Sequence, residues 1–253
     1  MRNKKLIITF SVLVSVTLLV ILTSVLFSVQ HVRVYCANAQ ESEFADEVLN
    51  SHGIKKNSSI FFVNESEVKA NIEKKLGNKV RVLNIERVFP NKIYINYIEV
   101  IPYLRLRLAT SQGITTYYCS DDLKVMYEYE GMHSEISAID FKFKGEFSVG
   151  DGGALKFTDG SAATVVKEIF AGFEELGYYG SVIALFREID LSGNYILLKV
   201  RDKDVTWQIH GADKLREKIR LALSYYDKHS SEIADGSVLI VPNEKTASVR
   251  SPG

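Results

Sequence analysis

An uncharged stretch close to the N-terminus constrains this chain more than any other feature. Residues 6–29 are 24 consecutive positions without a charged side chain. As an α-helix they would extend roughly 36 Å, which exceeds the hydrocarbon thickness of about 30 Å in a typical bilayer. Three basic residues, Arg2, Lys4 and Lys5, precede the stretch. Since positive charge stays on the cytoplasmic side, we predict a cytoplasmic tail at 1–5, a transmembrane helix at 6–29 in the lipid bilayer, and all later residues outside the cytoplasm.

A cleaved signal peptide is the main alternative to a retained anchor. Ala37, Asn38 and Ala39 resemble a small-residue cleavage site. However, the apolar core of a signal peptide usually has only about 7–15 residues. The site would also directly follow residues 32–36, which alternate as a strand. The sequence therefore favours a retained anchor.

The charge balance limits the partners of the chain. The 31 basic and 31 acidic residues cancel, and without Arg2, Lys4 and Lys5 the remainder has 28 basic and 31 acidic residues. A slightly acidic domain lacks the basic face that displaces counterions from phosphate, so we predict no nucleic-acid partner. Cys36 and Cys119 are the only cysteines. They could pair if two domains touched, but two unbonded thiols are the favoured interpretation.

Residues 30–104 are predicted to form a small module of strands and helices. Apolar periodicity and turn residues predict a strand at 32–36, a helix at 43–52, a helix from Asn64 to Gly77, and strands at 80–88 and 93–100. Val48 and Leu49 share one face of the first helix. Asn64 and Glu67 have the spacing of a capping box. The β-α-α-β-β order predicts a small sheet with two helices covering one face.

The remaining residues, 105–253, are predicted to form a strand-rich α+β domain. Its predicted strands lie at 114–119, 124–129, 195–201, 205–210 and 238–241, and its predicted helices at 161–177 and 215–226. Trp207 shares one strand face with Val205 and Ile209. Ser161 is the expected N-cap of the first helix.

The search for catalytic and metal-binding motifs points away from an enzyme. The five histidines form no HxxxH or HExxH pair, and no GxSxG or GxxxxGK motif is present. Residues 150–153 lack the lysine of a phosphate-binding loop and are typical of a turn. Carboxylates such as Glu128, Glu130, Glu135 and Asp140 are interspersed with strand residues, which is typical of a solvated face. We therefore predict no catalytic residue, no metal ligand and no cofactor.

The stretch 86–102, ERVFPNKIYINYIEVIP, has the most specific pattern in the chain. It combines an arginine, a proline, an alternating apolar strand, and a glutamate and a proline near its end; these are Arg87, Pro90, Ile93, Ile95, Glu99 and Pro102. Together with the basic tail, the single anchor and the β-α-α-β-β module, the pattern resembles the bacterial cell-division family FtsQ/DivIB. The module resembles the POTRA domain of that family. Residues 58–63, 211–223 and 236–252 resemble further parts of the family, and Lys218 is one of the matching positions.

Two departures from the family pattern are visible. Val100 stands where the family often has an arginine after the glutamate. Residues 239–241 are entirely apolar, whereas the last strand of the family often carries an aspartate and an aromatic residue. These departures leave the resemblance intact but blur which residues contact partners.

The resemblance implies a non-enzymatic divisome scaffold at the division septum, held in the bacterial cell (inner) membrane by a single span. Such a protein would bind the FtsL-type and FtsB-type (DivIC in Gram-positive bacteria) single-pass proteins and help control septal peptidoglycan synthesis. Two other classes stay open. An outer-membrane assembly factor would need a large membrane domain that the mixed pattern after residue 104 does not supply. A membrane-anchored extracytoplasmic cell-wall enzyme or sensor domain would need a convergent site that the sequence does not show.

The strand formed by Val238, Leu239, Ile240 and Val241 is the predicted partner-binding element. It is short, lies near the chain end, and is followed by a proline that cannot donate to a ladder, so we expect it at a sheet edge. An edge strand can accept a partner strand through backbone hydrogen bonds. One alternating pair would face the core and the other the partner, and the sequence does not decide which. An ordinary core strand is an equally weighted alternative.

Overall fold

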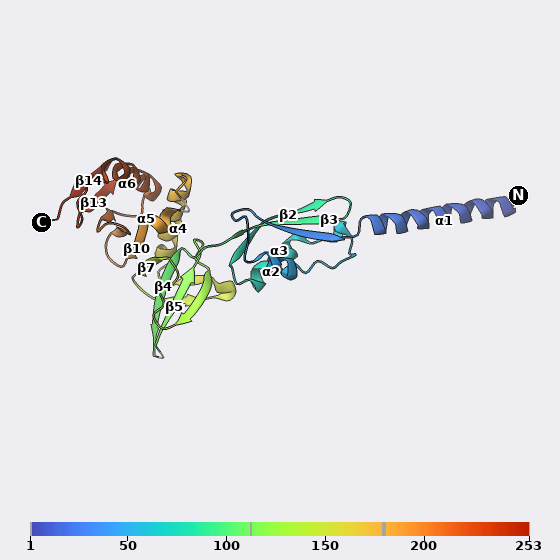
Figure 1. The fold of residues 1–253 in the computed structure, drawn as a ribbon, viewed down its shortest axis with the longest axis horizontal. Helices are drawn as coiled ribbons and strands as arrows, with labels where there is room; N and C mark the ends of the chain where they lie inside the picture. Colours follow the sequence, from blue (N-terminus) through green and yellow to red (C-terminus); the bar gives the residue numbers. More distant parts are fainter. Residues whose placement is uncertain (1, 112, 179–180, 253) are drawn as a thin grey trace. The chain divides into compact units, whose positions relative to one another are not determined.

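The computed structural model describes residues 2–111, 113–178 and 181–252, and the side chains of residues 2–11 and 110 lie outside the description. The chain divides into two compact units, Met1–Val100 and Ile101–Gly253. The first unit begins with helix α1, Arg2–Leu26 (Figure 1). Among the residues searched, no helix is both long enough and apolar enough to cross a membrane. The structure does not describe the side chains of residues 6–11, which are part of the predicted span, or those of the basic residues Arg2, Lys4 and Lys5.

After α1, the first unit is a three-stranded sheet with two helices. Its elements are β1 (His31–Cys36), α2 (Ala45–Ser51), the 3-10 turn η1 (Ile60–Phe62), α3 (Glu65–Lys75), β2 (Val80–Val88) and β3 (Lys92–Glu99). The strand order is β1-β3-β2, with β1 parallel and β2 antiparallel to the central strand. The predicted β-α-α-β-β order is confirmed, and η1 is an addition that the apolar pattern did not reveal.

The core of the first unit follows the predicted periodicity with one exception. Val48, Ile72 and Ile95 have no exposed surface, and the Asn64 side chain accepts a hydrogen bond from the Glu67 backbone N–H at 3.3 Å, as expected for an N-cap. The prediction for Leu49 is wrong, because this side chain is 39% exposed. Helix α2 buries Val48 and the residue three positions later, which turns the position after Val48 about 100° away from the core.

The second unit is built on a nine-stranded sheet with the order β14-β13-β12-β11-β10-β7-β4-β5-β6. The strands are β4 (Leu104–Thr110), β5 (Gly113–Cys119), β6 (Val125–Glu130), β7 (Ile139–Phe143), β10 (Phe186–Leu191), β11 (Ile196–Val200), β12 (Thr206–Ile209), β13 (Val238–Asn243) and β14 (Thr246–Arg250). A separate hairpin pairs β8 (Phe147–Val149) with β9 (Leu155–Phe157) around the 3-10 turn η2 (Asp151–Gly153). The predicted strands at 195–201 and 205–210 are confirmed as β11 and β12, which pair as an antiparallel hairpin.

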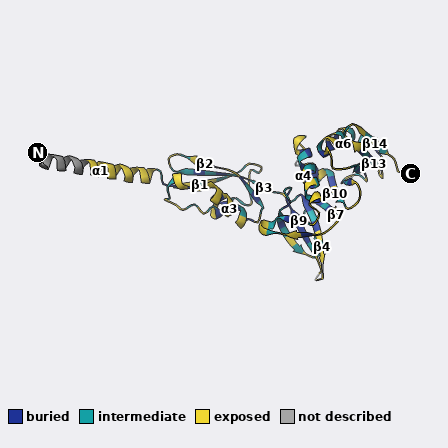
Figure 2. Cartoon of the chain, turned by 180° about the vertical axis from the view of Figure 1, so that it is seen from behind, coloured by how far each residue is buried: buried dark blue, intermediate teal, exposed yellow. Residues whose placement is uncertain are grey.

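Three helices complete the second unit: α4 (Gly160–Glu175), α5 (Val182–Leu185) and α6 (Leu215–His229). Trp207 is fully buried among Phe173 of α4, Phe186 of β10 and Tyr226 of α6. Gly172 lets α4 and α6 approach closely, because a Cβ there would lie 3.3 Å from the Ile219 side chain. Figure 2 shows the buried residues, in dark blue, gathered in the strands and on the helices beside them.

Helix α4 starts two residues earlier than the sequence suggested. The expected cap was Ser161, but Asp159 caps the helix by accepting a hydrogen bond from the Ser161 backbone N–H at 2.9 Å. Aspartate and serine are both good N-caps. Asp159 precedes Ser161 in the chain, and the helix begins directly after Asp159. The prediction of Ser161 as the cap is therefore wrong, although the helix itself is confirmed.

Candidate interaction surfaces

The predicted edge strand lies inside the sheet. β13 pairs in parallel with β12 and antiparallel with β14, so the edge position expected for Val238–Val241 is wrong. The cause is a turn, in which the Lys245 backbone N–H bonds to the Asn243 side chain at 2.9 Å and the tail folds back as β14. Leu239 and Val241 are fully buried, whereas Val238 and Ile240 are half-buried. The pair facing the core is therefore Leu239 with Val241.

The edge of the sheet on this side is β14, residues 246–250. Within the described residues it pairs only with β13, so one side of its backbone is unpaired (Figure 1). Ala247 and Val249 pack against the core, while Thr246, Ser248 and Arg250 are exposed. This strand carries no carboxylate.

The opposite edge of the sheet, β6, has a different character. Glu128 and Glu130 are exposed along it. Tyr129 stacks on His133 with ring centroids 3.9 Å apart, so the loop that carries His133 lies beside the strand. Charged side chains along an edge discourage strand addition. Of the two edges, β14 is the better template for a partner strand.

The motif residues of the first unit mainly stabilise the fold of that unit. Arg87 forms an ion pair with Glu65 at 2.9 Å and donates to the Val63 carbonyl at 3.0 Å, which fixes the segment leading into α3. Ile93 and Ile95 are fully buried on β3. These contacts explain the residue types without any partner.

The remaining motif residues occupy turns and strand ends. Pro90 lies in the turn between β2 and β3. The Glu99 backbone donates to the Asn38 side-chain oxygen at 3.0 Å, and the Asn38 amide donates to the Glu99 carbonyl at 2.9 Å. Pro102 is half-buried at the start of the second unit. The motif thus specifies a fold and leaves the binding surface unassigned.

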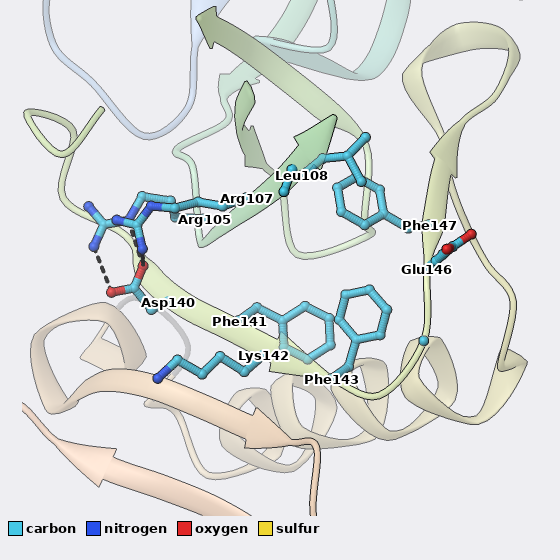
Figure 3. A pocket seen from close by; sticks show the side chains of 11 residues that line it. Arg105, Arg107, Leu108, Asp140, Phe141, Lys142, Phe143, Glu146 and Phe147 are labelled. Carbon is cyan, nitrogen blue, oxygen red and sulfur yellow. Dashed lines mark hydrogen bonds and ion pairs between the residues drawn. The ribbon is translucent and has the colours of Figure 1, made fainter. Parts of the chain in front are cut away.

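One hollow of the second unit has a volume of about 370 Å³ and is lined by β4, β7 and the start of β8 (Figure 3). On one side Arg105 holds Asp140 through two parallel hydrogen bonds of 2.7 and 2.8 Å, and Arg107 approaches the same carboxylate at 3.4 Å. Phenylalanines line the other side, among them Phe143 and Phe147. The hollow offers charge pairing and an apolar wall, which suit binding.

The carboxylate of this hollow is held ionised. Burial opposes the charged form of Asp140, but the hydrogen bonds and charge of Arg105, with the charges of Arg107 and Lys142, outweigh burial and lower its pKa. The reciprocal effect raises the pKa of Arg105. An ionised carboxylate that is engaged by a guanidinium is a poor general base, so the pair is structural.

A second carboxylate, Glu188 on β10, is paired in a similar way. Its two oxygens lie 2.7 Å from Lys142 and 2.8 Å from Lys199. Burial again opposes ionisation, and the hydrogen bonds from both lysines outweigh it, so the pKa of Glu188 is lowered. Within the described residues, no group of three or more His, Cys, Asp or Glu side chains could hold a metal ion.

Helix α3 carries one spacing that is also found in catalytic motifs. Ser66 and Lys69 have the S-x-x-K spacing of some serine hydrolases. Both side chains are exposed, and the Lys69 ammonium lies 3.9 Å from the Glu73 carboxylate. The lysine is thus paired along the helix with a glutamate, so the spacing is incidental to the helix.

The two cysteines are free thiols, half-buried in the case of Cys36 and buried in the case of Cys119. Burial raises the pKa of Cys119 to about 12. A thiol with such a pKa is protonated at neutral pH and unreactive. Cys119 is therefore a core residue of β5.

Among the residues whose side chains are described, Lys218 of α6 is the most deeply buried charged group, with 1% of its surface exposed. Its ammonium donates to the His210 carbonyl at 2.6 Å and to the Asp213 side chain at 3.1 Å, with the Gly211 carbonyl at 3.4 Å. Gly211 has a φ of +70°, and a Cβ there would lie 2.7 Å from the Asp213 carboxylate. The lysine therefore ties the loop after β12 to the helix.

Comparison with known protein families identifies the first unit. Residues 27–99 match the POTRA domain, FtsQ-type, so the chain is a POTRA-domain protein. The match supports the resemblance to the FtsQ/DivIB family that residues 86–102 suggested. It indicates a role in cell division, and proteins with this domain are in general non-enzymatic scaffolds that work in divisome complexes. A comparison with characterised proteins found no match to the chain.

Proposed function

We propose that this chain is a non-enzymatic scaffold of the bacterial divisome that binds FtsL-type and FtsB-type (DivIC) partners and helps control septal peptidoglycan synthesis. The observation that carries the proposal is the unpaired side of β14 at the end of the nine-stranded sheet, in a chain with an FtsQ-type POTRA domain. The partner-binding role assigned to Val238–Val241 moves to β14, and β13 supports it from within the sheet.

Strand addition gives this edge enough contact for recognition. Along a five-residue strand, alternate residues direct their backbone groups outward, so an added strand forms on the order of five hydrogen bonds. Each contributes roughly 0.5–1.5 kcal/mol net, before the partner's ordering is subtracted. The exposed face of β14, with Thr246, Ser248 and Arg250, supplies the selectivity of side-chain contacts.

Membrane anchorage is part of the same proposal. Residues 6–26 form the transmembrane segment, three residues fewer than the sequence suggested because α1 ends at Leu26, with residues 1–5 in the cytoplasm and both folded units outside it at the division septum. The support is the 25-residue length of α1 and the part of the uncharged stretch that it contains, residues 6–26. At 1.5 Å per residue such a helix is about 37 Å long, which is sufficient for a bilayer.

Two single proline substitutions test the β14 interface in the full chain. Backbone N–H groups alternate in direction along a strand, so one of Ala247→Pro and Ser248→Pro removes a bond to β13 and the other removes only an outward donor. We expect one variant to lower the thermal midpoint of the second unit. The other should keep that midpoint and lose co-purification with the FtsL-type and FtsB-type partners.

The matched control is the opposite edge. Of Glu128→Pro and Tyr129→Pro on β6, the variant that keeps its thermal midpoint should retain partner binding. If the folded β14 variant binds the partners as tightly as the parent chain, β14 is not the interface and the proposed binding mode is wrong.

A further inference from the structure

Three phenylalanines are exposed on η1 and on the turn between β2 and β3. The exposed fractions are 56% for Phe61, 87% for Phe62 and 57% for Phe89. Phe61 and Phe89 lie 5.6 Å apart by ring centroids, and both contact Phe27, at 5.2 and 6.1 Å. They come from η1 and from the turn between β2 and β3. We call Phe61, Phe62 and Phe89 the aromatic patch.

The patch is fixed to the last turn of α1. Phe27 directly follows the helix, and its carbonyl accepts a hydrogen bond from the Ile60 backbone at 2.9 Å. The Val29 N–H donates to Ser58 at 2.8 Å, and the Asn57 N–H donates to Val29 at 2.9 Å. These bonds leave little freedom between the helix end and the residues that carry the patch.

The uncharged stretch therefore ends inside the folded module. Its last residues, 27–29, have left the helix, and Val29 is 1% exposed within the core of the first unit. The boundary between span and domain falls at Phe27. If α1 lies in a bilayer, the patch that contacts Phe27 lies at the bilayer surface.

The charges around the patch suit the same location. Lys55 and Lys56 are exposed in the segment that leads to η1, and the nearby Glu65 carboxylate is paired with Arg87 at 2.9 Å. Exposed cations close in sequence to exposed aromatic residues favour an interface with anionic lipid headgroups. Large apolar groups exposed together in a soluble region mark an interaction site.

We infer that Phe61, Phe62 and Phe89 insert into the interfacial region of the bilayer that α1 spans and thereby hold the POTRA domain against the membrane. The inference rests on the proposed membrane anchorage, and it adds a second membrane contact outside the helix. Lipid is the committed occupant. A second copy or a partner helix over the patch is an outcome that the experiment separates.

Depth-dependent fluorescence quenching tests the inference on the full chain in liposomes. Three variants are compared with the parent, whose only tryptophan, Trp207, is fully buried. They are Phe62→Trp in the patch, Leu19→Trp in α1, and Tyr35→Trp. Tyr35 is 42% exposed and lies four residues along β1 from His31, about 13 Å further along the strand. Lipids brominated on the acyl chain near the headgroup quench only an indole in contact with the bilayer.

We expect brominated lipid to quench the added fluorescence of Phe62→Trp at least two-fold, while the Tyr35→Trp signal stays unchanged. Quenching should persist as the protein is diluted in lipid, which distinguishes lipid from a second copy. If Leu19→Trp is quenched and Phe62→Trp is not, the patch does not contact lipid. The inference is then wrong, while the proposed membrane anchorage stands. If neither is quenched, the anchorage fails and the inference fails with it.

Discussion

Replacing Lys218 by methionine should destabilise the second unit without affecting the first. The lysine is 1% exposed and bonds three oxygens from the loop between β12 and α6. Methionine has nearly the same length, so the substitution removes the hydrogen bonds without opening a large cavity. The His210 and Gly211 carbonyls lose their charged donor.

The expected size of the effect follows from these contacts. Hydrogen bonds to a charged group contribute about 1.5–3 kcal/mol each. The Asp213 side chain is 78% exposed, so water replaces that bond, and the Gly211 contact is long at 3.4 Å. Removing a buried ammonium also relieves its desolvation, which offsets part of the loss. A net loss of about 2–4 kcal/mol remains, which corresponds to roughly 4–16 °C in the thermal midpoint of a domain of this size.

Trp207 gives a domain-specific measurement, because it is the only tryptophan and lies in the core of the second unit. Thermal unfolding of Lys218→Met would be followed by its fluorescence. The matched control is Lys228→Met on the same helix, where the lysine is exposed and a change within about 0.5 kcal/mol is expected. Equal midpoints for the two variants would refute the structural role assigned to Lys218.

Two further predictions concern the cores and charge pairs of the units. Ile95→Asp should unfold the first unit and leave the Trp207 unfolding transition in place, because an unpaired carboxylate buried in the sheet costs several kcal/mol. Circular dichroism reports the folding of the whole chain and Trp207 fluorescence that of the second unit. Loss of the Trp207 transition together with the first unit would contradict two independently folding units. Asp140→Asn should lower stability to urea at pH 7. Because the folded-state pKa of Asp140 is lowered, its contribution is present above the unfolded pKa of about 3.9 and is lost as pH falls through the folded value. The difference between parent and variant should shrink below about pH 4, and a constant difference would show that the carboxylate charge is not responsible.

Periodicity predicted the elements of the first unit well because each of them buries one regular face. Val68, Ile72 and Leu76 recur every four residues and are all buried. The second unit was harder. β4 reads Leu-Arg-Leu-Arg-Leu and could have been found by its alternation, but β7, β10 and β14 are short and mix charged with apolar residues. A short strand is recognised by its neighbours in space more than by its own pattern.

Strand order was the part that the sequence could not supply. The apolar run at 239–241 correctly indicated buried side chains at Leu239 and Val241, but the strand lies inside the sheet because β14 pairs with its outer edge. The pair of Arg105 and Asp140 has the same origin, since it spans 35 positions and exists because β4 and β7 align these residues in register. Register between distant strands depends on the whole sheet, so neither feature leaves a local signal.

The residues that carry the family resemblance and the residues that carry the proposed binding are different sets. Arg87 is engaged by Glu65, and Ile95 is buried, so substitutions there act on binding only through folding of the first unit. None of the family-motif residues lies on β14, where backbone groups make most of the proposed contacts and exposed side chains add selectivity. A recognition surface of this kind is more sensitive to loss of a backbone donor than to a change of one side chain. Ile95→Asp and the β14 prolines therefore probe separate properties: a partner that depends on the edge alone should still bind the second unit of Ile95→Asp, and should be lost from the folded β14 variant.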